Sequence, residues 1–207
     1  MKNYLTTLLL LVGLAINAQS PYEKGMNKAF EFWGKGKSME ASQMFERISN
    51  AEKDNWLPSY YVATLEILSS FGVKDESILT TKLTKAQKYL DHANKLSPKN
   101  PEILITQALL HTAYINFDGQ KYGMVMSGKN SQLYAEALAI APQNPRVVLG
   151  YAEWNMGAAR FFGKSTKPYC EQVKKAIELG KKEEVKLQFH PRFQVKRAEQ
   201  VLKNCES

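Results

Sequence analysis

The residues that first suggest chemistry are Gly163, Lys164, Ser165 and Thr166, which resemble the end of a phosphate-binding loop. A complete loop of this kind has another glycine five positions before the Gly-Lys pair, where this chain has Ala158. The preceding residues have a helical pattern, so no strand-loop-helix cradle would bring backbone amides together around a phosphate. We therefore predict no nucleotide site and no bound cofactor.

His92, His111 and His190 are the other side chains suited to metal binding or acid–base catalysis. They lie far apart in the sequence, and no cysteine or carboxylate accompanies them at the spacing of a zinc site. Neither a nucleophile elbow nor a distinct pair of acids accompanies them. The sequence thus predicts no metal site, no catalytic residue and no enzymatic activity. We expect His111 to be a packed or hydrogen-bonded core residue.

Residues 1–18 have the three parts of a secretory signal peptide. Lys2 gives a positive start, Leu5 to Ile16 is apolar, and the small residue Ala18 precedes the expected cleavage point. The apolar run is short for a membrane span, and a retained anchor is the alternative. No cysteine adjoins the cleavage point, so we expect no lipid anchor there. We predict a periplasmic or secreted protein in which residues 19–207 form a single domain without a transmembrane segment.

The chain has 207 residues and a formal net charge of +8, which could suit nucleic acid, anionic lipid or acidic protein partners. Its lysines are spread over most of the sequence. The densest group, at residues 174–186, is interrupted by Glu178, Glu183 and Glu184 and is typical of a solvated helix face. Together with export, this pattern argues against binding to nucleic acid.

A phrase that occurs twice indicates how the chain is organised. Residues 96–101 read Leu-Ser-Pro-Lys-Asn-Pro and residues 140–145 read Ile-Ala-Pro-Gln-Asn-Pro, each between two helical patterns. The first proline ends a helix, the asparagine suits the turn, and the second proline suits the start of the next helix. This repetition predicts an array of helix pairs. Such arrays usually bind other molecules rather than transform them.

The run from Ala86 through Leu90 and Ala93 to Pro98, followed by Asn-Pro, resembles the second helix of a tetratricopeptide repeat. The resemblance covers most of residues 22–183. The signal sequence, the Phe-Phe-Gly-Lys stretch at 161–164 and the terminal Cys205 also resemble exported repeat proteins of Bacteroidetes-type bacteria. The resemblance implies an all-α superhelix of about four helix pairs with a C-terminal capping helix.

The repeats of this chain are longer than those of the family. Ala93 and Ala137 are 44 residues apart, whereas a tetratricopeptide repeat has about 34 residues and HEAT-type repeats, the open alternative, have about 40–47. Because the junctions between pairs are regular, we place the extra residues in turns inside the pairs, at 72–81, 117–129 and 162–168. The expected helices span residues 22–34, 39–51, 58–71, 80–96, 101–116, 131–140, 145–161, 167–182 and 192–203.

Cys170 and Cys205 are the two cysteines of the chain. Cys170 starts the eighth expected helix and Cys205 follows the ninth, and consecutive antiparallel helices place these two ends side by side. In an oxidising compartment such a pair favours a disulfide, provided that the Cα atoms lie about 4.4–6.8 Å apart. We predict that this bond holds the capping helix in place, and two free thiols are the alternative.

An exported array without a catalytic set predicts a scaffold that binds a protein or peptide. In stacked pairs the first helices line a concave groove, and a groove filled by the chain's own loops is the alternative. Two other functions remain open: a structural module that docks on a membrane complex through its basic surface, and an envelope small-molecule binder or enzyme in which His111, Asp118 and Tyr122 share a pocket. The candidate groove residues are Phe30, Trp33, Tyr60, Thr64, Ile105, Leu109, Arg146, Leu149 and Glu153.

Overall fold

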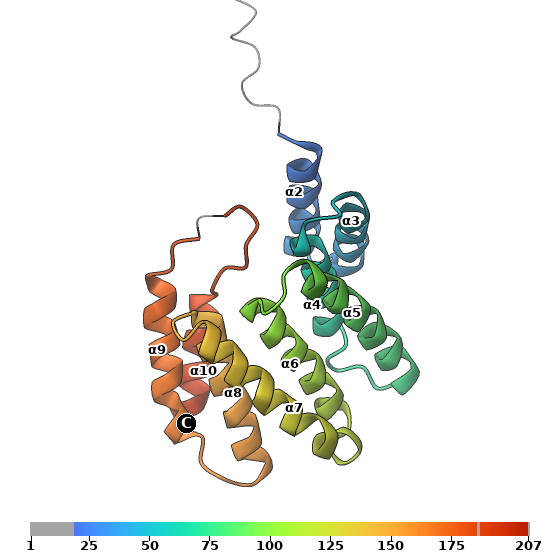
Figure 1. The fold of residues 1–207 in the computed structure, drawn as a ribbon. Helices are drawn as coiled ribbons and strands as arrows, with labels where there is room; N and C mark the ends of the chain where they lie inside the picture. Colours follow the sequence, from blue (N-terminus) through green and yellow to red (C-terminus); the bar gives the residue numbers. More distant parts are fainter. Residues whose placement is uncertain (1–18, 186, 207) are drawn as a thin grey trace, which may run out of the picture.

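The computed structural model describes residues 19–185 and 187–206 (Figure 1). This part of the chain contains helices and no strand, which confirms the predicted all-α class. The predicted signal peptide lies outside the described residues. None of the described helices combines the length and the apolar composition that a membrane crossing requires. The elements are α2 (Pro21–Gly34), α3 (Ser38–Ala51), α4 (Trp56–Leu68), α5 (Glu76–Leu96), α6 (Pro101–Phe117), α7 (Gly119–Ile140), α8 (Pro145–Phe161), the 3-10 turn η1 (Lys167–Tyr169), α9 (Cys170–Lys181) and α10 (Val195–Glu206).

The two Pro-x-Asn-Pro phrases form the junctions that the sequence predicts. Asn100 and Asn144 are the N-caps of α6 and α8. Their side-chain oxygens accept hydrogen bonds from the backbone amides of Glu102 and Arg146, at 3.0 and 2.9 Å. A proline follows each cap at the start of the helix, where its missing amide proton would have no helical partner. Both junctions therefore end one pair and begin the next in the same way.

The extra length of the repeats was predicted to lie in turns, and the structure corrects this prediction. Asp118 alone separates α6 from α7, and its carboxylate accepts hydrogen bonds from two amides in the first turn of α7. Asp75 caps α5 in the same way. Each aspartate lets the second helix of its pair start early, because it satisfies amides that would otherwise be unpaired. The chain is helical from Glu76 and from Gly119 onward, and of the expected turns only 162–168 stays largely irregular.

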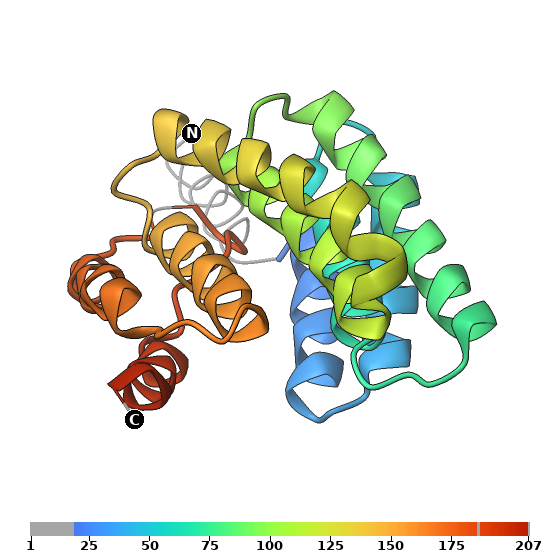
Figure 2. The ribbon, with the colours of Figure 1, turned by 90° about the horizontal axis from the view of Figure 1, so that it is seen from below.

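The helices form two layers that wind into a superhelix. First helices of successive pairs contact one another, as α4 contacts α6 and α6 contacts α8, while each second helix packs on its own partner. In Figure 2 the turns inside the pairs lie toward the lower side and the junctions between pairs toward the upper side. The array therefore has an inner layer, an outer layer and two different edges.

The buried apolar residues fall into two cores. The N-terminal core extends from α2 to α6 and contains large rings such as Phe45 and Tyr61. The C-terminal core joins α8, α9 and α10 around smaller side chains, among them Val173 and Met156. The two ends of the array are thus stabilised by different kinds of packing.

The predicted disulfide is confirmed. Cys170 at the start of α9 and Cys205 near the end of α10 are bonded, with their Cα atoms 5.7 Å apart and a sequence separation of 35. Thr166 adds a hydrogen bond from its hydroxyl to the carbonyl oxygen of Cys205, at 3.2 Å. The bond fixes the capping helix to the last pair.

Between α9 and α10 the chain leaves the C-terminal core and returns to the first helices. We call residues 183–185 and 187–194 the closing segment; Figures 1 and 2 both show it reaching from α9 toward α2. The ring of Phe189 lies 5.6 Å from that of Tyr22 and 5.9 Å from that of Phe30. Its carbonyl oxygen accepts a 2.6 Å hydrogen bond from the hydroxyl of Tyr61. The two ends of the array are therefore in contact across the inner layer.

Candidate functional site

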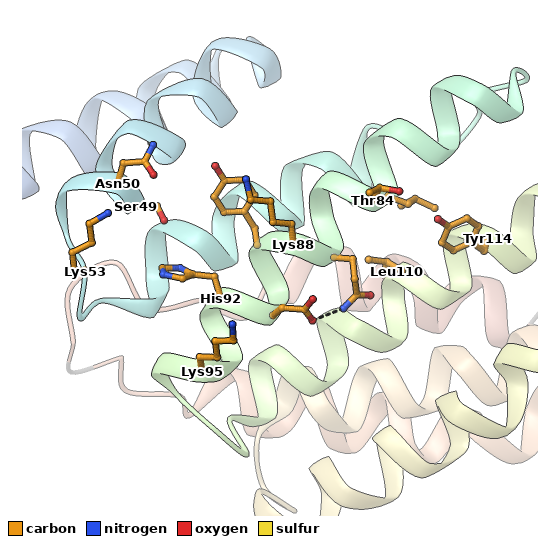
Figure 3. Close-up of a pocket in the computed structure, with 13 residues that line it drawn as sticks. Ser49, Asn50, Lys53, Thr84, Lys88, His92, Lys95, Leu110 and Tyr114 are labelled. Carbon is orange, nitrogen blue, oxygen red and sulfur yellow. Dashed lines mark hydrogen bonds between the residues drawn. The ribbon is translucent and has the colours of Figure 1, made fainter.

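A cavity of about 660 Å³ opens between α3, α5 and α6, a size in the range of small-molecule sites. Figure 3 shows Asn50 near the end of α3 and Lys53 in the turn after it, opposite Lys88, His92 and Lys95 on α5. The cavity therefore brings one imidazole and three ammonium groups into one space. Lys53 comes from the turn between α3 and α4, and the other three groups come from α5.

A second cavity, of about 700 Å³, lies between α3, α4 and α5. Its charged side chains already neutralise one another: Lys85 pairs with Glu66 at 3.1 Å, and Lys82 pairs with Glu66 at 3.9 Å. The first cavity is the better candidate, because its charged groups are available to a ligand.

His92 is held in place by a chain of hydroxyl groups. The Oγ atoms of Ser49 and Ser59 are 2.7 Å apart, and Ser59 Oγ lies 2.8 Å from His92 Nδ1. When Nδ1 carries the proton it donates to Ser59, and Nε2 keeps a lone pair for a ligand. Metal-binding histidines commonly have their second ring nitrogen fixed in this way.

The cationic side chains of the cavity have little internal compensation. Lys53, Lys88 and Lys95 form no salt bridge with any described residue. The carboxylate of Asp91, on the same wall, accepts a 2.8 Å hydrogen bond from the amide of Gln87. The part of the cavity that these lysines line is therefore suited to an anionic group.

Another part of the lining is apolar and aromatic. Leu83 and Leu110 are buried, and Tyr89 and Tyr114 lie beside them. Burial raises the pKa of both tyrosines, and the 2.7 Å hydrogen bond from Tyr89 to Glu46 raises that of Tyr89 further. Both phenols stay protonated at neutral pH, so His92 is the best metal ligand of the cavity.

The nine predicted groove residues all lie on the first helices α2, α4, α6 and α8, as expected. Phe30, Trp33 and Tyr60 join an aromatic cluster around Tyr61, whose ring is 4.8 Å from that of Phe30 and 6.0 Å from that of Trp33. Phe189 of the closing segment covers this cluster. Burial raises the pKa of Tyr60 and of Tyr61 well above the usual value.

Arg146 lies at the centre of a separate ion-pair cluster. Its guanidinium is 2.9 Å from the carboxylate of Glu102 and 2.6 Å from that of Glu183, the first residue of the closing segment. Glu183 also accepts a 2.9 Å hydrogen bond from the backbone amide of Phe193. Arg146 therefore anchors the closing segment to α6 and α8.

The remaining groove residues have their own surroundings. Thr64 donates a hydrogen bond to the carbonyl oxygen of Tyr60, and Glu153 pairs with Arg197 of the capping helix at 2.6 Å. Leu149 is buried in the C-terminal core, while Ile105 and Leu109 are half-buried on α6. The structure brings the nine residues onto one layer but not into one cavity.

The other residues singled out in the sequence have structural partners. His111 Nδ1 lies 2.8 Å from the side-chain oxygen of the fully buried Asn130, and burial lowers the pKa of His111, which agrees with a core histidine. Tyr122 donates a hydrogen bond to Glu76, and Asp118 caps α7. His111, Asp118 and Tyr122, the alternative set for a small-molecule pocket, thus each have a different partner.

The hydroxyls of the phosphate-loop-like stretch also have structural partners. Ser165 accepts a hydrogen bond from the backbone amide of Lys167, at 3.2 Å, and Thr166 donates to Cys205 of α10. Both hydroxyls shape the connection to α9.

Sequence reasoning missed His92 as a candidate ligand and Phe189 as a groove-covering residue. His92 precedes Ala93, a repeat-defining alanine, and its only local signal is its helical spacing of four and three residues from Lys88 and Lys95. Phe189 has a positive φ of 63°, which is unusual for an aromatic residue. No pattern in the sequence indicates the contact partners of either residue.

No family model matches this chain, and no curated protein matches it. Among solved structures, the HusA haemophore from Porphyromonas gingivalis is similar in fold. The TM-score is 0.79 at 21% sequence identity, and the alignment covers 92% of this chain and 96% of that one. The tetratricopeptide assignment therefore stays a resemblance, while the fold over most of this chain is similar to that of a known structure.

Proposed function

We propose that this chain is an exported, non-catalytic protein that binds haem in the cavity between α3, α5 and α6. The observation that carries the proposal is His92, whose Nδ1 is hydrogen-bonded to Ser59 so that Nε2 is left for iron. Export follows from the predicted signal peptide and agrees with the disulfide, since such bonds persist outside the cytoplasm.

The donor set of the cavity suits haem better than a bare metal ion. The described residues contain no group of three or more histidine, cysteine or acidic side chains that could hold a metal ion. A bare cation needs several protein ligands, whereas the porphyrin supplies most ligands to haem iron and the protein adds one or two. A single well-oriented histidine is therefore sufficient for haem.

The rest of the cavity matches the shape and charge of haem. The ring is flat and apolar, and the walls formed by Leu83, Leu110 and the two protonated tyrosines offer apolar and aromatic surface. The propionates are anionic, and Lys53, Lys88 and Lys95 are the cations available to them. The likeness to a haemophore is independent support, although at 21% identity it concerns the fold alone.

A spectroscopic titration tests the proposal. Adding haem to the purified protein should produce a Soret band typical of a histidine-bound iron. His92→Ala should abolish that band, and Ser59→Ala should weaken affinity by about 10–100-fold, the effect typical of losing a hydrogen bond to a metal-binding histidine. His190→Ala, which changes a histidine outside the cavity, is the matched control and should bind haem normally.

Two results would argue against this site. Normal binding by His92→Ala would place the haem elsewhere. Equal affinity for haem and for metal-free protoporphyrin would show that no residue coordinates the iron, and Lys53→Gln with Lys95→Gln would then test whether the same cavity holds the ring by charge and stacking alone.

Recognition of a protein or peptide is a second candidate, favoured by one observation. The inner layer already holds an extended piece of chain: Phe189 packs on Tyr22 and Phe30, and Tyr61 donates to the Phe189 carbonyl oxygen. Aromatic packing combined with a hydrogen bond to the backbone is how grooves bind peptides. The same surface could therefore accept a peptide with an exposed aromatic residue when the closing segment moves away.

Opening the surface by mutation tests this second candidate. The Phe189→Ala variant should bind a synthetic peptide with the sequence of residues 187–193, with a change in tryptophan fluorescence, whereas the unmodified protein should bind it weakly. A peptide with alanine in place of its first phenylalanine is the control. If Phe189→Ala keeps its fold and binds neither peptide, the inner layer is not a peptide groove.

A further inference from the structure

The edge formed by the turns inside the helix pairs carries most of the exposed apolar side chains. We call it the turn edge, and it comprises residues 34–39, 68–78, 117–125 and 160–168. Among the described residues, ten large hydrophobic side chains are exposed, and eight of them lie on this edge. Met124 is 94% exposed, Phe161 73% and Phe162 69%. Soluble proteins seldom gather exposed apolar groups in this way without a binding partner.

The apolar side chains protrude from separate turns. Phe161 and Phe162 contact each other edge to face, with ring centroids 5.1 Å apart, and Gly119 at the start of α7 lies against Phe161. Met39 and Ile78 protrude from the ends of the first two pairs. Apolar side chains that protrude separately can insert into a lipid bilayer, because lipids rearrange around them. A protein partner would instead need a complementary pocket for each side chain.

Cationic side chains surround these apolar side chains. The turn edge contains seven lysine or arginine residues and three acidic residues, and Arg160, Lys164 and Lys167 adjoin the phenylalanine pair. The three acids have other roles: Asp75 and Asp118 cap helices, and Glu76 accepts hydrogen bonds from Lys121 and Tyr122. Lys35 pairs with Glu31 and Lys121 pairs with Glu76, so the net positive charge of the edge lies mainly beside the phenylalanine pair.

We propose that the turn edge docks on the surface of an anionic lipid bilayer, with Phe161 and Phe162 inserted at the level of the headgroups. Apolar groups flanked by lysine and arginine are the features of interfacial membrane binding, and each cation near an anionic surface adds attraction. This site is separate from the cavity at His92 and from the inner layer, so it does not depend on the ligand that the protein binds there.

Flotation with lipid vesicles tests the proposal. The protein should float with vesicles of phosphatidylcholine mixed with phosphatidylglycerol and bind vesicles of phosphatidylcholine alone more weakly. The double variant Phe161→Ser and Phe162→Ser should lower partitioning by about tenfold or more, since even partial burial of the two rings together contributes at least that factor. The variant Lys164→Gln and Lys167→Gln should reduce binding to the anionic vesicles and make it less sensitive to salt.

Ile140→Ser is the matched control, because Ile140 is 44% exposed at a junction on the opposite edge. This variant should float like the unmodified protein, and circular dichroism should show that every variant is folded. The proposal is overturned if the unmodified protein binds neither kind of vesicle, or if Ile140→Ser loses as much binding as the phenylalanine variant. A dimer that dissociates on Phe161→Ser, without vesicle binding, would assign the edge to a second copy of the chain.

Discussion

The two ends of the superhelix are stabilised in different ways. At the N-terminal end, Phe30, Phe45 and Tyr61 form a continuous aromatic core that Phe189 completes. At the C-terminal end, α8, α9 and α10 bury smaller side chains and are cross-linked by the disulfide. Repeat proteins need their terminal pairs protected, because each pair contacts only its neighbours. Here one end relies on buried area and the other on a covalent bond.

The largest effect is expected from weakening the aromatic core. Phe45 is fully buried, with its ring 5.2 Å from that of Phe30 and 5.1 Å from that of Tyr61. Phe45→Ala should lower the free energy of unfolding by about 3–5 kcal/mol, which urea titration would measure. Phe71→Ala, at an exposed position, should cost far less. Similar losses for both variants would contradict the account of the N-terminal core.

Removing the cross-link should cost slightly less. In the chain-entropy model, a bond that closes about 35 residues stabilises by about 3–4 kcal/mol, so Cys170→Ala with Cys205→Ala should lower stability by that amount. Hydrogen exchange should accelerate in α9 and α10 and remain slow in α2 to α4. Uniform acceleration along the chain would mean that the two cores unfold as one unit.

Arg146 tests the link between the two ends. Arg146→Met leaves the buried carboxylate of Glu102, whose side chain is 7% exposed, without its cation. Loss of one partner of a buried pair costs about 3–5 kcal/mol, and we expect the lower limit because Arg146 keeps some contact with water. Adding Glu102→Gln should recover part of the loss. If the double variant is no more stable than Arg146→Met, the unpaired charge is not the cause.

The smallest effect concerns pH. His190 belongs to the closing segment, and its ring contacts that of Trp56. Burial lowers the pKa of His190; the carboxylate of Glu102 raises this pKa, and the charge of Arg146 lowers it. The unfolded chain takes up this proton near the usual value of about 6.5 and the folded chain only below it. Neutral His190 therefore contributes its full stabilisation of the folded chain above about pH 6.5, the pKa in the unfolded chain. This stabilisation is lost as the pH falls toward the lower pKa of His190 in the folded chain.

The amide of Phe193, which donates to Glu183, should consequently lose protection against hydrogen exchange on mild acidification, measured relative to the intrinsic exchange rate at each pH. His190→Gln should remove most of this response. His111→Gln is the control, since burial also lowers the pKa of His111 but its partner Asn130 lies outside the closing segment. An unchanged response in His190→Gln would locate the titrating group elsewhere.

Much of the fold follows from local signals. The Pro-x-Asn-Pro junctions were predictable because each residue acts on its own backbone: proline ends a helix, and Asn100 or Asn144 caps the next one. The length of the second helices was not predictable from the sequence. Gly119, Gly123 and Gly128 suggest a turn, whereas in the structure Asp118 caps a helix that packs on α6. The cysteine pairing was predictable from helix order alone.

The sequence by itself determined the all-α class, the helix-pair junctions and the cross-linked cap, since these depend on residues close in the chain or on the order of helices. Only the tertiary structure decided which residues meet across the superhelix. His92 meets Ser59 at a separation of 33 residues, and Tyr61 meets Phe189 at a separation of 128. Such contacts depend on the angle between successive pairs, which is set by the summed packing of many side chains and leaves no local pattern.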